Sequence, residues 1–187
     1  MQPDTHPPTL AGHTGLAGLT HAIARLLRHR WAEVGARRAL PADTLQRLAD
    51  RVTASEKLHT GQIRIIAEHS LPWSYLRRQA SARERAIMLF SKYRVWDTEH
   101  NNGVLIYLLM PEHAIEIVAD RGVSRHVPHD EWQRLIADMS AHFRRSEYEQ
   151  GLQSTIELVS SRLVTHFPRS LHTPGLNNEL PDAPLVR

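Results

Sequence analysis

The chain has 187 residues, of which 41% are hydrophobic and 23% charged, and its formal net charge is +3. This length and composition predict one soluble domain with a packed core and terminal tails, while so modest a positive charge does not by itself indicate a nucleic-acid-binding protein. The absence of cysteine excludes disulfides, thiolate nucleophiles and cysteine-ligated zinc or iron sites. No signal-peptide pattern and no apolar run of the roughly 18 residues that a membrane span needs is present, so we expect a cytoplasmic protein.

The N-terminal part of the chain is divided into a tail and a basic segment. Residues 1–18 are rich in Pro, Gly, Thr and His without periodicity and are expected to be disordered. Residues 19–40 hold a predicted basic amphipathic helix, over residues 21–34, and a linker. Either its arginines are simply solvated while its apolar face packs on the domain, or it binds an anionic surface or a protein partner. The partner surface would then consist of Arg25, Arg28, Arg30 and Trp31.

The next segments predict a β-α-β crossover. A helix from Pro41 to about Lys57 places proline in the first turn, where its missing N–H is tolerated. Gln62–Glu68 is apolar on both faces, as in an interior strand. Ser81 and Glu84 fit a capping box for a helix over Ala82–Tyr93. Because this helix lies between two strands, we expect a right-handed crossover to the next strand.

A β-hairpin is predicted after the crossover. Val104–Met110 and Ala114–Ala119 are apolar runs joined by a three-residue link, and residues 122–127 read as a loop. Pro128 then opens a helix to about residue 143. Ser146 and Glu149 form a second capping box for a helix to about residue 166, and residues 168–187 read as a flexible tail. Together these elements predict an α/β fold: a three-layer α/β/α sandwich around a small mixed sheet, occupying residues 41–167.

Oxygen-bearing side chains flank the hairpin at its open end. An antiparallel hairpin brings the residues before its first strand close to those after its second. Carboxylate and amide oxygens are the ligands that calcium and magnesium prefer, so a divalent-cation site is one hypothesis, and a turn whose amides merely tie the loop to the sheet is the other. Two arginines after the second strand could hold an anion such as phosphate. The candidate metal ligands are Asp97, Glu99, Asn102 and Asp120, and the candidate anion-binding residues are Arg121 and Arg125.

Other chemistry finds less support in the sequence. The chain has no Gly-x-Ser-x-Gly elbow, no P-loop and no His-Glu-x-x-His motif, so catalytic residues cannot be assigned. Glu68 ends its strand at the edge opposite Asn102 and is excluded from the site. The stretch Trp73–Arg78 mixes aromatic and basic residues that could stack on single-stranded nucleic acid, but a loop covering the sheet is the favoured interpretation.

Several segments occur here in an order that resembles a known family. The strand GQIRIIAE, the helix ERAIMLF, the segment WDTEHNNGVLIYLL, the strand AIEIVADRGV and the run FRRSEYEQGLQSTIELV follow one another. Over roughly Asp43–Phe167 they resemble the TPM domain, shared by thylakoid-lumen repair proteins and many bacterial proteins. The resemblance implies an α/β/α sandwich with a small mixed sheet, and in some members divalent-cation binding and acid phosphatase activity. Lacking a signal peptide and a membrane span, the chain is similar to the shorter, soluble bacterial branch.

Two functional hypotheses follow from the sequence. The first is a TPM-like domain that binds calcium or magnesium at the open end of the hairpin and has weak metal-assisted phosphatase activity. The second is a non-catalytic interaction module, in membrane or protein-complex maintenance, that holds a protein partner through the basic N-terminal helix. A single-stranded nucleic-acid binder is a further alternative, although nucleic acid is not the expected partner.

Overall fold

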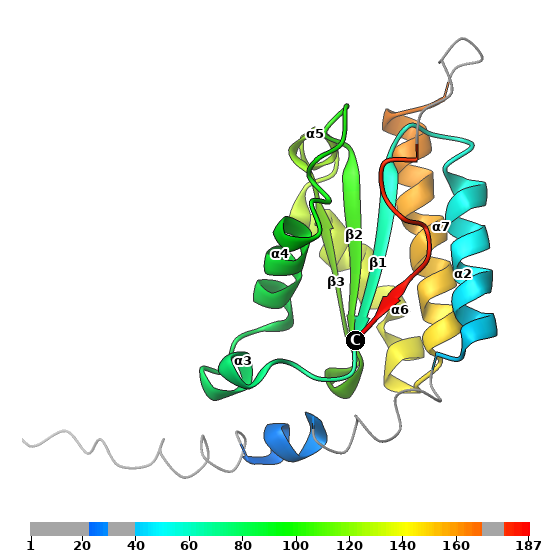
Figure 1. The fold of residues 1–187 in the computed structure, drawn as a ribbon. Coiled ribbons are helices and arrows are strands. Elements are labelled where there is room, and N and C mark those ends of the chain that lie inside the picture. The colour runs from blue at the N-terminus through cyan, green and yellow to red at the C-terminus, as the bar shows by residue number, and fades with distance from the viewer. Residues whose placement is uncertain (1–22, 30–39, 170–177) are drawn as a thin grey trace, which may run out of the picture.

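The computed structural model describes residues 23–29, 40–169 and 178–187, which form a four-stranded mixed sheet between layers of helices (Figure 1). The strand order is β3-β2-β1-β4, with β1 parallel to β2 and β4, and β2 antiparallel to β3. The strands are β1 (Gln62–Glu68), β2 (Gly103–Leu109), β3 (Ala114–Ala119) and β4 (Leu185–Val186). The helices are one over residues 23–29, α2 (Ala42–Ser55), α3 (Trp73–Arg77), α4 (Ala82–Lys92), the 3-10 turn η1 (Met110–Glu112), α5 (Arg121–Ser124), α6 (His129–Arg144) and α7 (Tyr148–His166).

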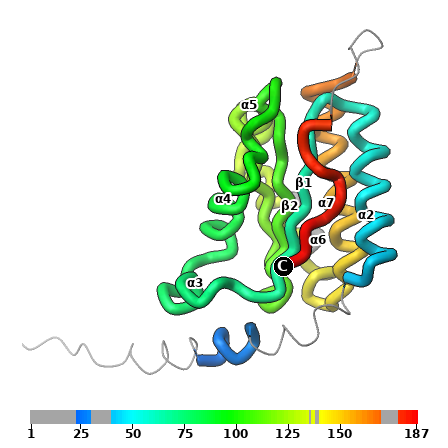
Figure 2. The backbone as a smooth tube through the Cα atoms, viewed as in Figure 1, coloured from blue at the N-terminus to red at the C-terminus, as the bar shows by residue number. Residues whose placement is uncertain are grey.

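The helices lie on both faces of the sheet, as the predicted α/β/α sandwich requires. Helices α2, α6 and α7 cover one face, while α3 and α4 lie on the other side (Figures 1 and 2). Every residue of β1 and β2 is buried. The fold class expected from the sequence is confirmed, because strands that are apolar on both faces are stable only when both faces are covered.

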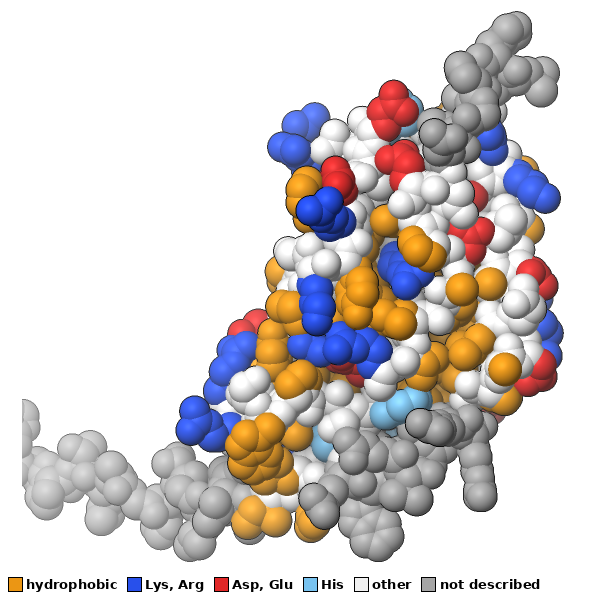
Figure 3. All heavy atoms as spheres, viewed as in Figure 1, with side chains coloured by type: hydrophobic (Ala, Val, Ile, Leu, Met, Phe, Trp, Pro, Cys, Tyr) orange, Lys and Arg blue, Asp and Glu red, His pale blue; other side chains and the backbone are white. Residues whose placement is uncertain are grey.

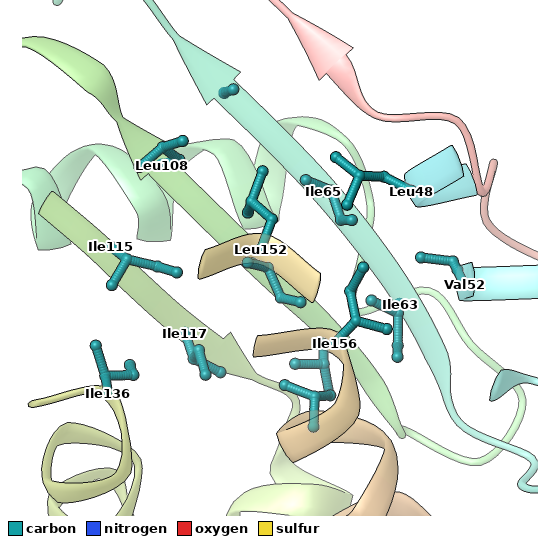
Figure 4. Close-up of a cluster of buried hydrophobic side chains, with 14 of the residues drawn as sticks. Leu48, Val52, Ile63, Ile65, Leu108, Ile115, Ile117, Ile136, Leu152 and Ile156 are labelled. Atoms are coloured by element: carbon teal, nitrogen blue, oxygen red, sulfur yellow. The ribbon is translucent and has the colours of Figure 1, made fainter. Parts of the chain in front are cut away.

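The larger core lies between the sheet and the α2, α6 and α7 layer. Figure 4 shows Ile63 and Ile65 of β1 against Leu152 and Ile156 of α7, with Leu48 from α2 beside them. Alternate residues of β2 supply the smaller core on the other face, where they meet the buried side of α4. Full burial of each such aliphatic side chain contributes roughly 1.5–3 kcal/mol, so the two cores position the sheet edges firmly.

The hairpin has the predicted pairing and a link that is one residue longer than expected. Val104 pairs with Ala119, and the register runs to the pair Leu109 and Ala114. Met110, expected as the last residue of the strand, instead begins η1. His113 closes the link with φ 49°, in the left-handed region. The open end of the hairpin therefore lies at the start of β2 and the end of β3.

Two local predictions near helix starts had different outcomes. Ser81 caps α4 as expected, since its Oγ accepts the Glu84 N–H at 3.1 Å. The second capping box is wrong: Ser146 takes φ 61° in the turn after α6, and α7 begins at Tyr148 with Glu147 at its N-cap and no side-chain cap. Residues 122–127 were expected to form a loop, but residues 122–124 belong to the short helix α5.

The C-terminal segment departs from the expected flexible tail. Leu185–Val186 pairs in parallel with Ile66 and Ala67 at the edge of β1. Leu180 is 5% exposed in the smaller core, and its N–H donates to the Gln62 Oε1 at 3.2 Å. Residues 178–187 thus pack on the sheet, because paired backbone and one buried leucine fix a segment that has no periodic pattern.

The predicted N-terminal elements are described only in part. Residues 23–29 form a helix inside the predicted span of residues 21–34. Residues 1–18, together with Arg30 and Trp31, lie outside the described residues. None of the described helices is long and apolar enough to cross a membrane.

Candidate functional site

The open end of the hairpin is a row of three neighbouring backbone positions. Gln62 of β1 pairs with Gly103 of β2, and the carbonyl of Gly103 accepts the Asp120 N–H at 2.9 Å. A Cβ at Gly103 would overlap the Val95 carbonyl oxygen, so only glycine allows the loop after α4 to pass this closely. Hydrogen-bonded sheet backbone therefore fixes the positions of the residues next to the predicted site.

Asn102 is the most deeply buried of the predicted ligands, with no exposed surface. Its backbone N–H donates to Thr98 Oγ1 at 3.0 Å, and its side-chain Nδ2 donates to Thr60 Oγ1 at 3.2 Å. Its side-chain Oδ1 is buried and has no hydrogen-bond partner. A buried amide oxygen without a donor costs about 1–3 kcal/mol, which marks this atom as one that a ligand could satisfy.

Asp120 has one engaged oxygen and one unpaired oxygen. The residue is 8% exposed and caps α5, where its Oδ1 accepts the Arg121 N–H at 2.7 Å. Its Oδ2 is buried without a partner. Beside it, the Gly122 N–H donates to the Asn101 carbonyl at 3.0 Å, which fastens the loop before β2 to the start of α5.

The two other predicted metal ligands lie on the rim. The side chain of Asp97 is 54% exposed and its Oδ2 lies 3.8 Å from Arg94 Nη1. Glu99 is exposed, and its backbone N–H donates to Glu179 Oε2 at 3.0 Å. Within the described residues no three His, Cys, Asp or Glu side chains gather closely enough to hold a metal ion. The structure therefore buries one unpartnered oxygen of Asn102 and one of Asp120 at this edge and leaves Asp97 and Glu99 exposed.

The predicted anion-binding arginines both lie on or next to α5. Arg121 is exposed, and its Nε donates to Asn101 Oδ1 at 3.1 Å. Arg125 is exposed at the C-cap of the helix, where its N–H donates to the Arg121 carbonyl at 3.2 Å. Both arginines thus belong to the short segment that Asp120 caps, and both side chains are exposed to solvent.

A polar cavity of about 160 Å³ at the start of β1 adds residues that were not among the predicted site residues. His59 lines it, is 1% exposed, and makes a 3.0 Å hydrogen bond between Nδ1 and the Gly61 carbonyl, so Nδ1 carries the proton and Nε2 is left without a partner. Burial lowers the pKa of His59 to about 4, so the ring is neutral at pH 7. Its neighbour Thr60 is the residue that bonds Asn102, which places His59 at the same sheet edge.

Glu56 lines the same cavity and is perturbed in the opposite direction. Its Oε1 accepts the Ile63 N–H at 2.7 Å. Burial raises the pKa of Glu56 to about 8, and the charge of Asp182 adds to the shift. A signal for these residues was present in the sequence, because polar side chains in the short segment before a buried strand lie at the same edge as those before its parallel neighbour.

The predicted partner surface on the N-terminal helix is only partly exposed. Arg25 is 8% exposed, and its Nε lies 2.6 Å from Glu112 Oε1 while its Nη2 donates to the Ala80 carbonyl at 2.7 Å. Arg25 therefore does not belong to the free surface, because its charge is used within the domain. Arg28 is exposed.

Glu68 lies at the opposite edge, as expected, next to Leu109 in the register. It is 2% exposed and accepts two hydrogen bonds from Arg85, at 2.8 and 2.6 Å, and one from the Tyr107 hydroxyl at 2.9 Å. Burial raises the pKa of Tyr107, and the negative charge of Glu68 adds to this shift. With its oxygens engaged, Glu68 is a structural ion-pair partner.

Comparison with known proteins identifies the fold. The family model described as the TPM domain matches residues 36–162. The BA42 protein of the psychrophilic bacterium Bizionia argentinensis is 25% identical with a TM-score of 0.67, over 79% of this chain and 95% of that chain. The N-terminal domain of a P. gingivalis protein is 20% identical with a TM-score of 0.56, over 70% and 83% of the two chains, and supports the fold alone. No curated protein matches the chain.

Proposed function

Because the chain belongs to the TPM domain family, whose model matches residues 36–162, we propose that it binds a divalent cation at the open end of the hairpin. The observation that carries this proposal is the pair of buried, unpartnered oxygens, Asn102 Oδ1 and Asp120 Oδ2, at one sheet edge. A buried oxygen without a partner destabilises the fold unless a cation or a hydrogen-bond donor contacts it. The side-chain oxygens of Asn102 and Asp120 are hard ligands of the kind that magnesium and calcium prefer.

The number of donors favours magnesium over calcium. Calcium takes six to eight oxygen ligands, whereas magnesium keeps several waters and is held by one or two carboxylates. Asp120 would supply a charged oxygen ligand and Asn102 a neutral one. The exposed carboxylates of Asp97 and Glu99 would make the local potential more negative without contacting the cation. Calcium is the comparison ion in the test.

We include weak hydrolysis of phosphate esters in the proposal. A bound cation would polarise a phosphate oxygen and lower the pKa of bound water. The chain itself supplies two exposed arginines, Arg121 and Arg125, on and next to the helix that Asp120 caps, and guanidinium groups suit the phosphate oxygens of a substrate. No described side chain is assigned as nucleophile or general base.

Calorimetric titration of metal-stripped protein with magnesium, calcium and manganese tests cation binding. Asp120→Asn should weaken binding at least about tenfold, because it removes the only buried charge of the site. Its unfolding midpoint in urea should barely change, because asparagine caps helices as well as aspartate does. Asp97→Asn should weaken binding only about twofold, and Asp50→Asn, on exposed α2 surface, should have no effect.

Equal binding of magnesium by the wild type and Asp120→Asn would reject the site.

Hydrolysis of p-nitrophenyl phosphate in the presence of magnesium tests the proposed phosphatase activity separately. Arg121→Gln should lower kcat/KM about tenfold while leaving the calorimetric affinity for magnesium unchanged. Cation binding without hydrolysis above the buffer rate would reject the phosphatase activity and keep the cation site.

A further inference from the structure

The end of the molecule that carries α3 exposes large apolar side chains. Trp73 is 65% exposed, Leu27 52% and Ile23 47%. In Figure 3, orange apolar and blue basic side chains lie side by side at this protruding end, where Figure 1 places α3. Exposed apolar side chains that gather in one place mark interaction sites more often than isolated ones do.

These side chains belong to one continuous surface because the helix of residues 23–29 is fastened to both flanks of α3. Before α3, the Leu71 N–H donates to His29 Nδ1 at 3.1 Å. After α3, the Ala80 carbonyl accepts Arg25 Nη2 at 2.7 Å. Both contacts are buried, so the two helices form a single tip rather than two separate projections (Figure 2).

The tip is also positively charged. Arg28 and Arg77 are exposed, and the side chain of Arg78 is 50% exposed. Glu84 pairs with Arg78, and the guanidinium of Arg78 lies 4.6 Å from the centre of the Tyr75 ring. We call this the tip surface, defined by Ile23, Leu27, Arg28, Trp73, Arg77 and Arg78.

We propose that the tip surface docks on a membrane that contains anionic phospholipids. Aliphatic side chains such as Ile23 and Leu27 can enter the acyl boundary, and tryptophan prefers the membrane–water interface. Exposed arginines beside them complement the negative headgroups. Single-stranded nucleic acid fits this surface less well, because its bases stack on rings and only Trp73 among the three exposed apolar side chains has one.

This inference is independent of the cation site, which lies at the other end of the sheet. Figure 1 shows α3 and α5 at opposite ends of the molecule. A chain docked through the tip surface would hold the open end of the hairpin away from the lipid, where it stays accessible from water.

Co-sedimentation of the full chain with lipid vesicles tests the proposal. We expect binding to vesicles of equal phosphatidylcholine and phosphatidylglycerol, weaker binding at high salt, and little binding to pure phosphatidylcholine. Arg28→Gln and Arg77→Gln should each weaken the affinity about fivefold, as loss of one basic contact near a charged surface predicts. Trp73→Ala should weaken it about tenfold.

Two matched variants control for exposure and charge. Trp96→Ala removes a tryptophan that is 47% exposed at the other end of α4, and Arg51→Gln removes an exposed arginine from α2. Both should bind vesicles as the wild type does. Circular dichroism should show that all variants keep the fold, because the replaced side chains are exposed.

The proposal is overturned if the wild type fails to bind anionic vesicles at low salt, or if Trp96→Ala loses as much affinity as Trp73→Ala. Tighter binding to oligothymidylate than to vesicles, with the same loss in Trp73→Ala, would also overturn it and would identify the tip surface as a nucleic-acid site.

Discussion

Replacing Glu56 with glutamine should change how the stability of the domain depends on pH. The carboxyl of Glu56 has a pKa near 8 in the folded protein, because burial disfavours its charged form, against 4.5 without that burial. The contribution of the protonated form to folding is therefore complete below pH 4.5 and is lost as the pH rises through 8. Glutamine keeps an oxygen for the Ile63 N–H, which Glu56 Oε1 accepts at 2.7 Å, but it has no charge to bury.

The magnitude follows from the two pKa values. Between pH 5 and 7 the folded protein keeps the Glu56 proton and the unfolded chain releases it, so the free energy of unfolding falls by about 1.4 kcal/mol per pH unit. The wild type should thus lose about 3 kcal/mol relative to Glu56→Gln over this interval. At pH 5 the two proteins should differ by less than about 1 kcal/mol.

The free energy of unfolding of the wild type must be compared with that of Glu56→Gln at each pH, because titration of His59 changes stability with pH in the opposite direction. Burial lowers the pKa of His59 from 6.5 to about 4, so its contribution is present above pH 6.5 and is lost as the pH falls through 4. In the wild type the two slopes partly cancel below pH 6.5. His59 is unchanged in Glu56→Gln, so subtracting one stability curve from the other isolates Glu56.

Urea unfolding of both proteins at pH 5, 6, 7 and 8 measures this difference. Glu157→Gln is the control, because its side chain is 68% exposed on α7 and its replacement should shift stability equally at every pH. A difference between wild type and Glu56→Gln that stays constant from pH 5 to 8 would refute the reasoning, since it would mean that Glu56 ionises as freely in the folded state as in the unfolded one.

Three further substitutions test how the sheet edges are built. Arg85→Met should destabilise the protein by about 3–5 kcal/mol in urea unfolding, because it removes both short hydrogen bonds to the buried Glu68 and leaves only the Tyr107 hydroxyl and Arg187 at 3.7 Å, and an unchanged midpoint would show that the pair of Arg85 and Glu68 adds no stability. Gly103→Ala should cost more than about 3 kcal/mol, since its Cβ would overlap the Val95 carbonyl. Leu180→Ala should cost about 2 kcal/mol and speed hydrogen exchange of the amides that pair β4 with β1, whereas no effect would mean that the C-terminal segment is dispensable.

The fold could be predicted because its strands are local and unambiguous. Gln62–Glu68 and Ala114–Ala119 have the bounds that their apolar runs indicated. Ser81 could be identified as a cap from residues three positions apart. Burial on both faces of a strand leaves a continuous apolar pattern in the sequence, and that pattern requires helices on both sides.

What could not be predicted depends on contacts between distant residues. Leu185–Val186 is a strand only because the edge of β1 is available to it, and two residues carry no periodic signal. Arg25 reads as one basic residue of an amphipathic helix, yet it meets Glu112 87 positions later. A pairing of that kind cannot be inferred from helix periodicity, which describes one face and not its partner.

The candidate site was predicted in part for the same reason. The antiparallel pairing of β2 and β3 guaranteed that backbone before Gly103 meets backbone after Ala119. It did not determine the directions of side chains in the loop, where Arg94 and Asn101 take φ values of 52° in the left-handed region. Asp97 is exposed in this loop, although the antiparallel pairing of the hairpin had suggested that it would converge with Asp120.

The two ends of the sheet differ in how they treat buried polar atoms. At the carboxyl end of β1, the oxygens of Glu68 are engaged by Arg85 and Tyr107. At the amino end, in the described residues, His59, Asn102 and Asp120 each keep one buried atom without a partner. A fold that can satisfy a buried carboxylate fully at one edge has no general difficulty in doing so, and unpaired atoms at the other edge carry a cost that stability alone does not explain. That contrast is the physical reason for seeking the ligand of this domain at the open end of the hairpin.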